Sequence, residues 1–176
     1  MIALFRRLPR PVTSVLAFSL LGSAPLLATA QTSYSDEKVW TEAVAAPPTT
    51  FSTEVLIPFE VMKASALTYG IDPNTLTVGE DGVVRYVMVA RSSGGALNVL
   101  YQGIRCATAE TKTYGRLSDK GTWNASPDAD WQALSFRGPT RPAMILARQG
   151  ICEGRTITGN ARKILAALKS DRVDIR

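Results

Sequence analysis

Histidine is absent from this chain of 176 residues. Without an imidazole, serine–histidine and cysteine–histidine catalysis and histidine-ligated zinc are excluded, so carboxylates, lysine, serine and tyrosine remain as chemical actors. Ser35 and Lys38 have the spacing of the serine–lysine pair of penicillin-recognising enzymes, but the companion motifs of those enzymes are missing. A histidine-free Ser/Lys hydrolase is therefore only the alternative function, because so short a pattern is better explained by chance.

Carboxylates at metal-binding spacing are also scarce. Glu80-Asp81 and the pair Asp128 and Asp130 lie in segments typical of turns, and neither belongs to a full loop of spaced oxygen ligands such as calcium requires. We therefore expect no metal site and no cofactor.

Basic residues are in small excess, with 20 Lys and Arg against 15 Asp and Glu and a net charge of +5. Arg6, Arg7 and Arg10 belong to the leader described next, and without them 17 basic residues face 15 acidic ones, a net charge of +2. The remaining basic residues are scattered between acidic ones and form no stripe of the kind that binds phosphate backbones. We expect no nucleic-acid partner.

The N-terminal residues have the pattern of a secretory signal peptide, predicted over residues 1–30. The basic region is followed by an apolar stretch, Val15 to Leu27, and by Ala28-Thr29-Ala30, which has the small residues of a cleavage site. The apolar stretch is shorter than the roughly 20 residues that span a bilayer. We expect cleavage between Ala30 and Gln31 and export through the general secretory route. Because no cysteine stands at position 31, we expect a soluble periplasmic product that is not a lipoprotein and has no membrane span in its mature form.

Cysteine is rare, with two residues in the chain, Cys106 and Cys152. An oxidising compartment preserves disulfides and an even count leaves no thiol unpaired, so we expect these two residues to be bonded. A redox-active pair is the alternative, but catalytic dithiols usually stand as C-x-x-C, whereas these cysteines lie far apart. The bond would connect the end of a strand to the C-terminal helical part.

The apolar patterns predict the α+β class: residues 51–176 form one domain, an antiparallel β-meander of about five to six strands with two C-terminal helices packed on it. Between Asp72 and Cys106, apolar runs separated by glycine-containing loops at 79–82 and 92–95 predict three consecutive antiparallel strands. Both faces of the two long strands are apolar, which is typical of central strands.

Shorter elements are expected on either side of these strands. Pro58 makes the segment 51–61 an edge strand or an extended connection, and alternating apolar residues predict a strand at 65–71. A more polar strand is expected at Glu110–Leu117. A helix is predicted over Ala143–Gln149, and a second one after Asn160 as N-cap, with one apolar side made of Ala161, Ile164, Leu165 and Leu168. For the first helix, Thr140 is a possible cap and Gly150 a stop.

Residues 31–50 are predicted to be a flexible N-terminal arm, because the run Ala45–Thr50 is rich in Pro and Thr and cannot hold a regular ladder. The alternative is a short helix over Glu37–Ala43 that carries Trp40 inward. The position of Trp40 distinguishes the two.

One group of residues suggests a binding site: Arg85, Tyr101, Arg105 and Glu110. In regular strands Arg85 and Arg105 point to the face shared by Val87 and Tyr101. Two guanidinium groups beside an aromatic ring can bind an anionic group bidentately. The alternative is an internal ion pair that braces the sheet, with a carboxylate such as Glu110, because buried arginine is normally paired.

Two segments of the chain are distinctive: 81–86, Asp-Gly-Val-Val-Arg-Tyr, and 103–106, Gly-Ile-Arg-Cys. Through these segments the chain resembles the cryptic neisserial protein-like family, and the resemblance runs from Trp40 to Leu168. Trp123 and Trp131 agree more loosely, and Cys152 is similar to the family's second cysteine. The resemblance implies an exported bacterial protein with one small disulfide-bonded domain, and it implies no activity, ligand or catalytic residue.

Together these observations predict a non-catalytic periplasmic domain that binds an envelope protein or a small anionic ligand. No catalytic residue is assigned, and no pattern in the sequence indicates an oligomeric state.

Overall fold

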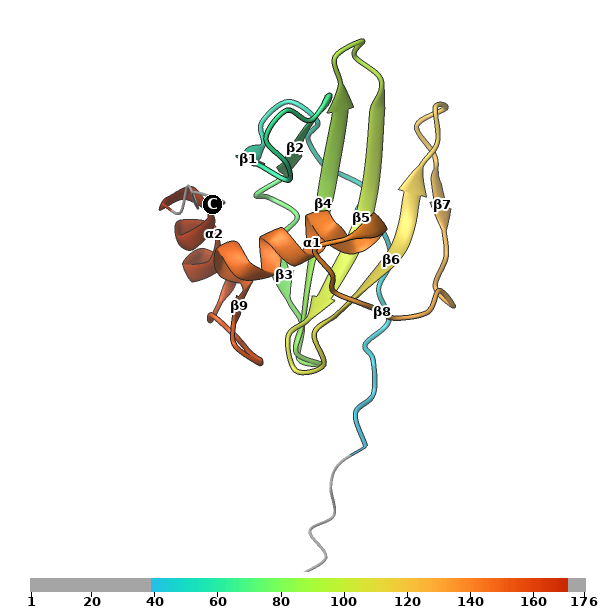
Figure 1. Cartoon of the computed structure of the whole chain (residues 1–176). Helices are drawn as coiled ribbons and strands as arrows, with labels where there is room; N and C mark the ends of the chain where they lie inside the picture. Colours follow the sequence, from blue (N-terminus) through green and yellow to red (C-terminus); the bar gives the residue numbers. More distant parts are fainter. Residues whose placement is uncertain (1–38, 171–176) are drawn as a thin grey trace, which may run out of the picture. The chain divides into compact units, whose positions relative to one another are not determined.

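The computed structural model describes residues 39–170, in which one antiparallel sheet carries the fold (Figure 1). The strand order is β1-β2-β4-β5-β6-β7, and two short strands pair beside this path, β3 with β4 and β8 with β6. The strands are β1 (Ile57–Phe59), β2 (Leu67–Ile71), β3 (Thr77–Val78), β4 (Val83–Ser92), β5 (Leu97–Arg105), β6 (Glu110–Leu117), β7 (Trp123–Ala125) and β8 (Gln132–Ala133).

The helical part follows the sheet in the sequence. It comprises a 3₁₀ turn (Gly138–Thr140), α1 (Arg141–Leu146), a π-helical turn (Ala147–Ile151), a small hairpin of β9 (Cys152–Glu153) and β10 (Thr156–Ile157), and α2 (Ala161–Ser170). Within residues 39–170, no helix combines the length and apolar character needed to cross a bilayer. The single α+β domain with an antiparallel sheet and two C-terminal helices is the fold that the sequence predicted.

The expected meander is confirmed in its long strands and corrected at its start. β4 pairs with β5 and β5 with β6, as predicted. The first expected strand is reduced to the two residues of β3, which pair with the start of β4, and β2 pairs with the rest of β4. The reason is the turn after β2, where the Asp72 carboxylate accepts the backbone N–H of Asn74 (2.9 Å). The Thr75 hydroxyl then accepts the N–H of Val87 (2.9 Å) in place of a strand carbonyl.

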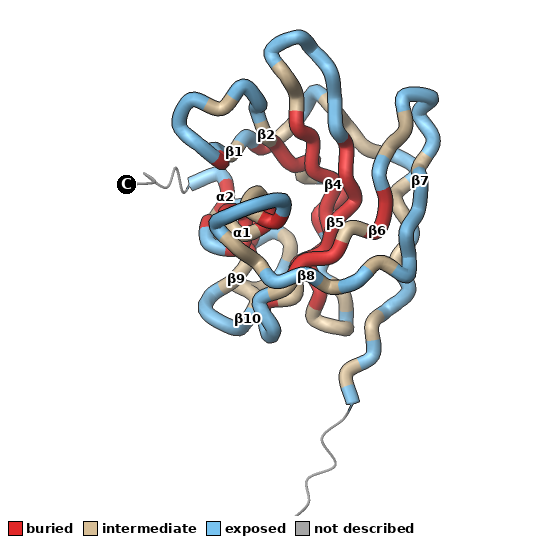
Figure 2. The backbone as a smooth tube through the Cα atoms, turned by 45° about the vertical axis from the view of Figure 1, so that its right-hand side comes forward, coloured by how far each residue is buried: buried red, intermediate tan, exposed pale blue. Residues whose placement is uncertain are grey.

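β4 is the central strand because both of its faces are covered. All residues from Val83 to Ala90 are buried, and the buried part of the chain in Figure 2 is centred on β4 and β5. Alternate side chains of β4 therefore belong to two separate apolar clusters, one on each face.

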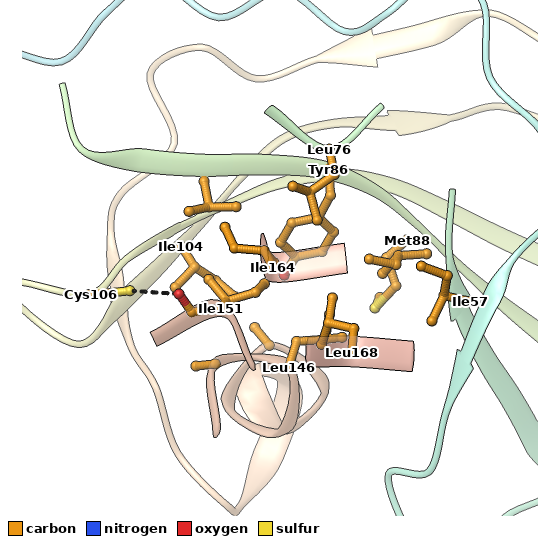
Figure 3. Packing of buried hydrophobic residues seen from close by; sticks show 14 of the residues in the cluster. Ile57, Leu76, Tyr86, Met88, Ile104, Cys106, Leu146, Ile151, Ile164 and Leu168 are labelled. Carbon is orange, nitrogen blue, oxygen red and sulfur yellow. Dashed lines mark hydrogen bonds between the residues drawn. The ribbon is translucent and has the colours of Figure 1, made fainter. Parts of the chain in front are cut away.

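The helices cover one face of the sheet. Tyr86 and Met88 of β4 and Ile104 of β5 pack against Ile151, which follows α1, and against Ile164 of α2 (Figure 3). Asn160 caps α2 as predicted, because its side-chain oxygen accepts the N–H of Lys163 (3.1 Å). The buried side chains of Ile164 and Leu168 place the apolar side of this helix against the sheet.

The first helix begins at Arg141, before the predicted Ala143, and its α-helical part ends at Leu146, before the predicted Gln149. Thr140 does not cap it with its side chain, because the hydroxyl donates to the Ala133 carbonyl (3.0 Å) instead. The end of the helix widens into the π-helical turn, which ends at Ile151, and the backbone leaves helical geometry one residue earlier, at Gly150, the predicted stop. Only glycine fits there, since a Cβ at this position would come within 2.7 Å of the Ala167 Cβ in α2.

The N-terminal segment covers the other face of the sheet. Residues 39–48 form neither helix nor strand, so the described part of the alternative helix, 39–43, is not helical. Ala45 and Phe51 pack with Trp123 against a cluster of Val87, Val89, Val99, Tyr101 and Tyr114. Of the arm predicted over 31–50, residues 39–50 have no regular structure and contact the sheet, and residues 31–38 lie outside the described residues.

Cys106 and Cys152 are joined in a disulfide, with a distance of 5.7 Å between their Cα atoms. Cys106 directly follows β5, and Cys152 begins β9 after the π-helical turn. The bond therefore connects the sheet to the helical layer, as the sequence predicted.

Removing the disulfide should lower the free energy of unfolding. Because the bond closes a loop with a sequence separation of 46 residues, the double variant Cys106→Ser/Cys152→Ser is expected to lose about 2 to 5 kcal/mol. Urea unfolding of the wild type with and without a reductant, next to the double variant, measures this loss. Equal unfolding midpoints in all three samples would contradict the prediction.

Candidate functional site

The sheet register brings the four predicted site residues to one face. Val87 of β4 lies opposite Tyr101 of β5, Val83 lies opposite Arg105, and Arg105 lies opposite Glu110 of β6. Arg85 is two residues from Val87 and therefore points to the same side. The predicted orientation of Arg85 and Arg105 is confirmed, and this side is the face that residues 39–56 cover.

Arg85 forms its ion pair with the carboxylate of Asp81, and not with that of Glu110, which the sequence suggested. Two guanidinium nitrogens of Arg85 donate to the two Asp81 oxygens, at 3.1 and 2.6 Å, and the side chains are 6% and 2% exposed. The pair forms because both residues belong to one hairpin, with Asp81 in the turn that leads into β4. Sequence reasoning placed Asp81 in a turn and missed that the turn folds its carboxylate back over the strand.

Burial and bonding act in opposite directions on this ion pair. Burial by itself raises the pKa of the Asp81 carboxyl, but the bonds from Arg85 and from the backbone N–H groups of Ala43 and Val83 outweigh it, so the pKa lies below its ordinary value. Burial likewise disfavours the Arg85 cation, yet the Asp81 hydrogen bonds leave its pKa raised. Both groups are therefore charged in the folded protein at neutral pH.

Arg105 has an aromatic partner instead of a carboxylate. Its guanidinium carbon lies 3.6 Å from the centroid of the Trp40 ring, which is a cation–π contact. Within residues 39–170 no ion pair joins Arg105 to Glu110, and the buried Nε of Arg105 has no hydrogen-bond partner. Tyr101 contacts the rings of Tyr114 and Trp123, at centroid distances of 5.5 and 6.5 Å. The four predicted residues thus share one face, and the side chains of Arg85, Arg105 and Tyr101 contact other protein side chains there.

Glu42 is the residue of this face that sequence reasoning missed. Its carboxylate accepts hydrogen bonds from the Tyr114 hydroxyl (2.7 Å), the Lys112 ammonium (3.0 Å) and the Trp131 indole N–H (3.3 Å). Burial alone raises the pKa of Glu42, but these three donors and the Lys112 charge bring it below its ordinary value. The pKa of Tyr114 is raised, by burial first and by its bond to Glu42 second. No spacing in the sequence links Glu42 to residues 70 to 89 positions away.

The opposite face of the sheet holds an open cleft of about 640 Å³ between the strands and the segment 138–142. Its floor is apolar, with Leu67 and Tyr69 of β2, Met88 and Ala90 of β4, and Leu100 of β5. A second hollow of about 630 Å³ continues past the segment 61–69 toward the end of α2, at Leu168 and Lys169. The volume of the first cleft is in the range typical of small-molecule sites.

Polar groups without partners line the first cleft. Gln102 is buried, and its amide donates to the Thr113 hydroxyl (2.9 Å) while its side-chain oxygen has no partner. The buried Nε of Arg141 has no hydrogen-bond partner, and no described carboxylate forms an ion pair with this residue. Arg116 donates to the Asn98 side-chain oxygen at the rim. Asp130 is the one carboxylate among the residues that line this cleft.

The family model of the CNP1-like family matches residues 35–169. The chain belongs to the CNP1-like family. This match spans the same region as the resemblance inferred from the sequence between Trp40 and Leu168. The comparisons with curated proteins and with solved structures found no match.

The CNP1-like domain gives no support to serine–lysine chemistry in the residues that the structure describes. Ser35 and Lys38 lie outside the described residues. Lys63 is exposed and forms no hydrogen bond with a serine hydroxyl between residues 39 and 170. In the same range, no three Cys, Asp or Glu side chains gather as metal ligands would.

Acid should destabilise the CNP1-like domain through Asp81 and Glu42. Their pKa values in the folded protein lie below the ordinary 3.8 and 4.5, so the unfolded chain binds more protons in acid. Their stabilisation is complete above the ordinary values and is lost as the pH falls through the folded values. We expect the unfolding midpoint to fall steeply below about pH 4.

The variants Glu42→Gln and Asp81→Asn test the origin of this acid sensitivity. Each should be less stable than the wild type at pH 7 and should lose less stability between pH 7 and pH 3 in thermal unfolding followed by circular dichroism. Glu80→Gln, at the exposed neighbouring position, serves as the control and should follow the wild-type profile. Parallel profiles for all four proteins would contradict the assignment.

Proposed function

We propose that this CNP1-like protein is a non-catalytic periplasmic binding protein whose ligand is a small anion with an apolar body, held in the cleft between the sheet and the segment 138–142. The observation that carries this proposal is Arg141, a cation that lines the cleft and has no described carboxylate partner. Arg85, by contrast, is neutralised within the fold. The small-ligand form of the proposal is favoured over an envelope protein because the cleft is concave and of small-molecule size.

The floor of the cleft suits an apolar ligand body. Leu67, which is 38% exposed, and Met62, which is 51% exposed, stand beside the partly buried Tyr69 ring. Covering such side chains removes apolar surface from water, which favours binding by about 25 cal/mol per Å². Methionine adapts to ligands of different shape because its side chain is unbranched and flexible.

The charged rim suits an anionic head group. Arg116 and Arg141 contribute two positive charges against the single carboxylate of Asp130. A guanidinium presents paired N–H donors to carboxylate or phosphate oxygens, and such charge-assisted bonds are roughly twice as strong as neutral ones. The unpartnered oxygen of Gln102 adds an acceptor at the floor, where a hydroxyl or amide of the ligand would satisfy it.

Three probes with one apolar chain and different head groups test the proposal: decanoate, decan-1-ol and decyltrimethylammonium. Isothermal titration calorimetry on the full chain, expressed with its own leader, should give the tightest binding for decanoate. In Arg141→Ala the affinity for decanoate should fall about tenfold, because a hydrogen bond to a charged group contributes about 1.5 to 3 kcal/mol. Arg148→Ala, an exposed arginine outside the residues that line the cleft, is the control and should bind as the wild type.

Equal affinity for the three probes, or the same loss in Arg148→Ala as in Arg141→Ala, would overturn the assignment of an anion-binding cleft. Decanoate binding that depends on Arg141 and not on Arg148 would establish it.

The proposed compartment rests on the leader and on the disulfide. A bond between Cys106 and Cys152 persists in oxidising compartments and is rare in the cytosol. We infer further that the family relationship includes the cryptic neisserial proteins that the sequence resembles, which agrees with export.

Cleavage of the leader gives a direct test of the compartment. When the full chain is expressed in a bacterium with an outer membrane, the periplasmic fraction should contain a product whose N-terminal residue is Gln31, as intact mass spectrometry would show. Ala28→Leu/Ala30→Leu removes the small residues of the cleavage motif and should block processing. Uncleaved wild-type protein in the cytosolic fraction would contradict the proposed export.

A further inference from the structure

The segment Trp40–Ala43 contacts the sheet as a bound peptide contacts a receptor. Residues 39–48 form no ladder with any strand. The segment is held by side chains of the sheet and of the loops beside it, through its Trp40 indole, its Glu42 carboxylate and the backbone of Ala43. Such a set of contacts recognises side-chain identity as well as backbone.

The Glu42 carboxylate fills a receptacle of three donors. Lys112 and Tyr114 come from β6, and Trp131 precedes β8, so the donors belong to the sheet side of the contact. The Lys112 side chain is 7% exposed. Leaving a charge that deeply buried without a partner is costly, so the receptacle requires an anion in the folded protein.

Trp40 and the Ala43 backbone complete the recognition. The Trp40 ring lies under the Arg105 guanidinium and meets the Trp131 ring edge to face, at a centroid distance of 6.0 Å. Its indole N–H donates to the Asp81 carbonyl (2.7 Å). The N–H of Ala43 donates to the Asp81 carboxylate (2.9 Å), and the carbonyl of Ala43 accepts from Arg85 (3.2 Å). The buried Asp81–Arg85 pair thus binds both backbone polar groups of one residue.

We propose that this face of the sheet is a peptide-binding site for a Trp-x-Glu-Ala segment, and that the arm of a second copy of this chain fills it when the two arms exchange. In this structure the chain's own segment Trp40–Ala43 fills the site and shows the kind of ligand that it accepts. The same segment from a second copy would repeat every contact, and exchange of identical elements between protomers is a low-cost route to dimers. Val39 and Val44, which flank the segment, are 85% and 101% exposed, so neither of these two side chains packs on the sheet.

Peptide binding tests the site itself. The variant Trp40→Ala/Glu42→Ala of the full chain, expressed with its own leader, lacks the two side chains that fill the site and keeps only the backbone contacts of Ala43. A synthetic peptide of residues 38–48 is then titrated into this variant by calorimetry. We expect saturable binding of one peptide per chain. A peptide carrying Glu42→Gln should bind at least about tenfold more weakly, because it loses charge-assisted bonds. A peptide carrying Thr41→Ala, which alters a side chain that makes none of the contacts described here, is the matched control and should bind as the wild-type peptide.

Complementation tests the exchange between copies. The variant Lys112→Met/Tyr114→Phe keeps the arm and removes two donors with little change in volume, whereas Trp40→Ala/Glu42→Ala keeps the receptacle and lacks the ligand side chains. Mixing the two should give a heterodimer by sedimentation velocity, while each alone does not form that species. Circular dichroism of each variant before mixing establishes that it is folded.

The outcomes separate the two parts of the proposal. Failure of the folded Trp40→Ala/Glu42→Ala variant to bind the wild-type peptide, or equal binding of the Glu42→Gln and wild-type peptides, would overturn the peptide site. Peptide binding without a heterodimer in the mixture would overturn the exchange and restrict the site to the chain's own arm. Because the decanoate cleft lies on the opposite face of the sheet, neither result depends on the proposed function.

Discussion

The burial of β4 on both faces is the constraint on which the rest of the structure depends. A strand whose side chains from Val83 to Ala90 are all buried needs a cover on each side of the sheet. The helices supply one cover, and the disulfide between Cys106 and Cys152 connects that layer to the end of β5. Residues 39–56 supply the other cover, although they form neither helix nor strand.

The arm can cover the sheet because its polar groups are satisfied there. A buried strand that carries Arg85 requires a countercharge, and Asp81 in the preceding turn provides it within the same hairpin. The remaining hydrogen-bonding capacity of this pair binds the Ala43 backbone, so one ion pair neutralises a core charge and also anchors the arm. Glu42 anchors the arm in the reverse way: here the charged group belongs to the arm, and Lys112 and Tyr114 of the sheet donate hydrogen bonds to its carboxylate.

The two faces of the sheet therefore differ in chemistry. On the arm side the charged side chains of Glu42, Asp81 and Arg85 are bound by protein groups. On the helix side the helices leave a cleft over the ends of β2, β4 and β5, in which Gln102 and Arg141 keep unpartnered atoms. A face with satisfied charges stabilises the fold, whereas unpartnered polar atoms in a concave site are where a ligand gains most from binding.

Much of the fold follows from local patterns. The alternation along β4 and β5, the strand Glu110–Leu117, the Asn160 cap and the pairing of two cysteines were all predictable, because each depends on neighbours in the sequence or on a count. The same alternation placed Arg85, Tyr101, Arg105 and Glu110 on one face. The length of strand β3 was overestimated because the hydrogen bonds of Asp72 and Thr75 shorten this strand. These bonds involve tertiary partners as well as local ones.

The partners of the charged residues were decided by the tertiary structure. Asp81, and not Glu110, neutralises Arg85. Trp40 lies against Arg105, and Glu42 reaches Lys112 across 70 positions. These pairings depend on where the arm lies on the sheet. The cleft, too, is built from pieces of five strands and the segment 138–142. The sequence by itself determined which residues are buried along each strand and which face they share, because strand geometry is periodic. Only tertiary packing decided which distant groups meet, because no sequence period relates an irregular arm to the surface that it covers.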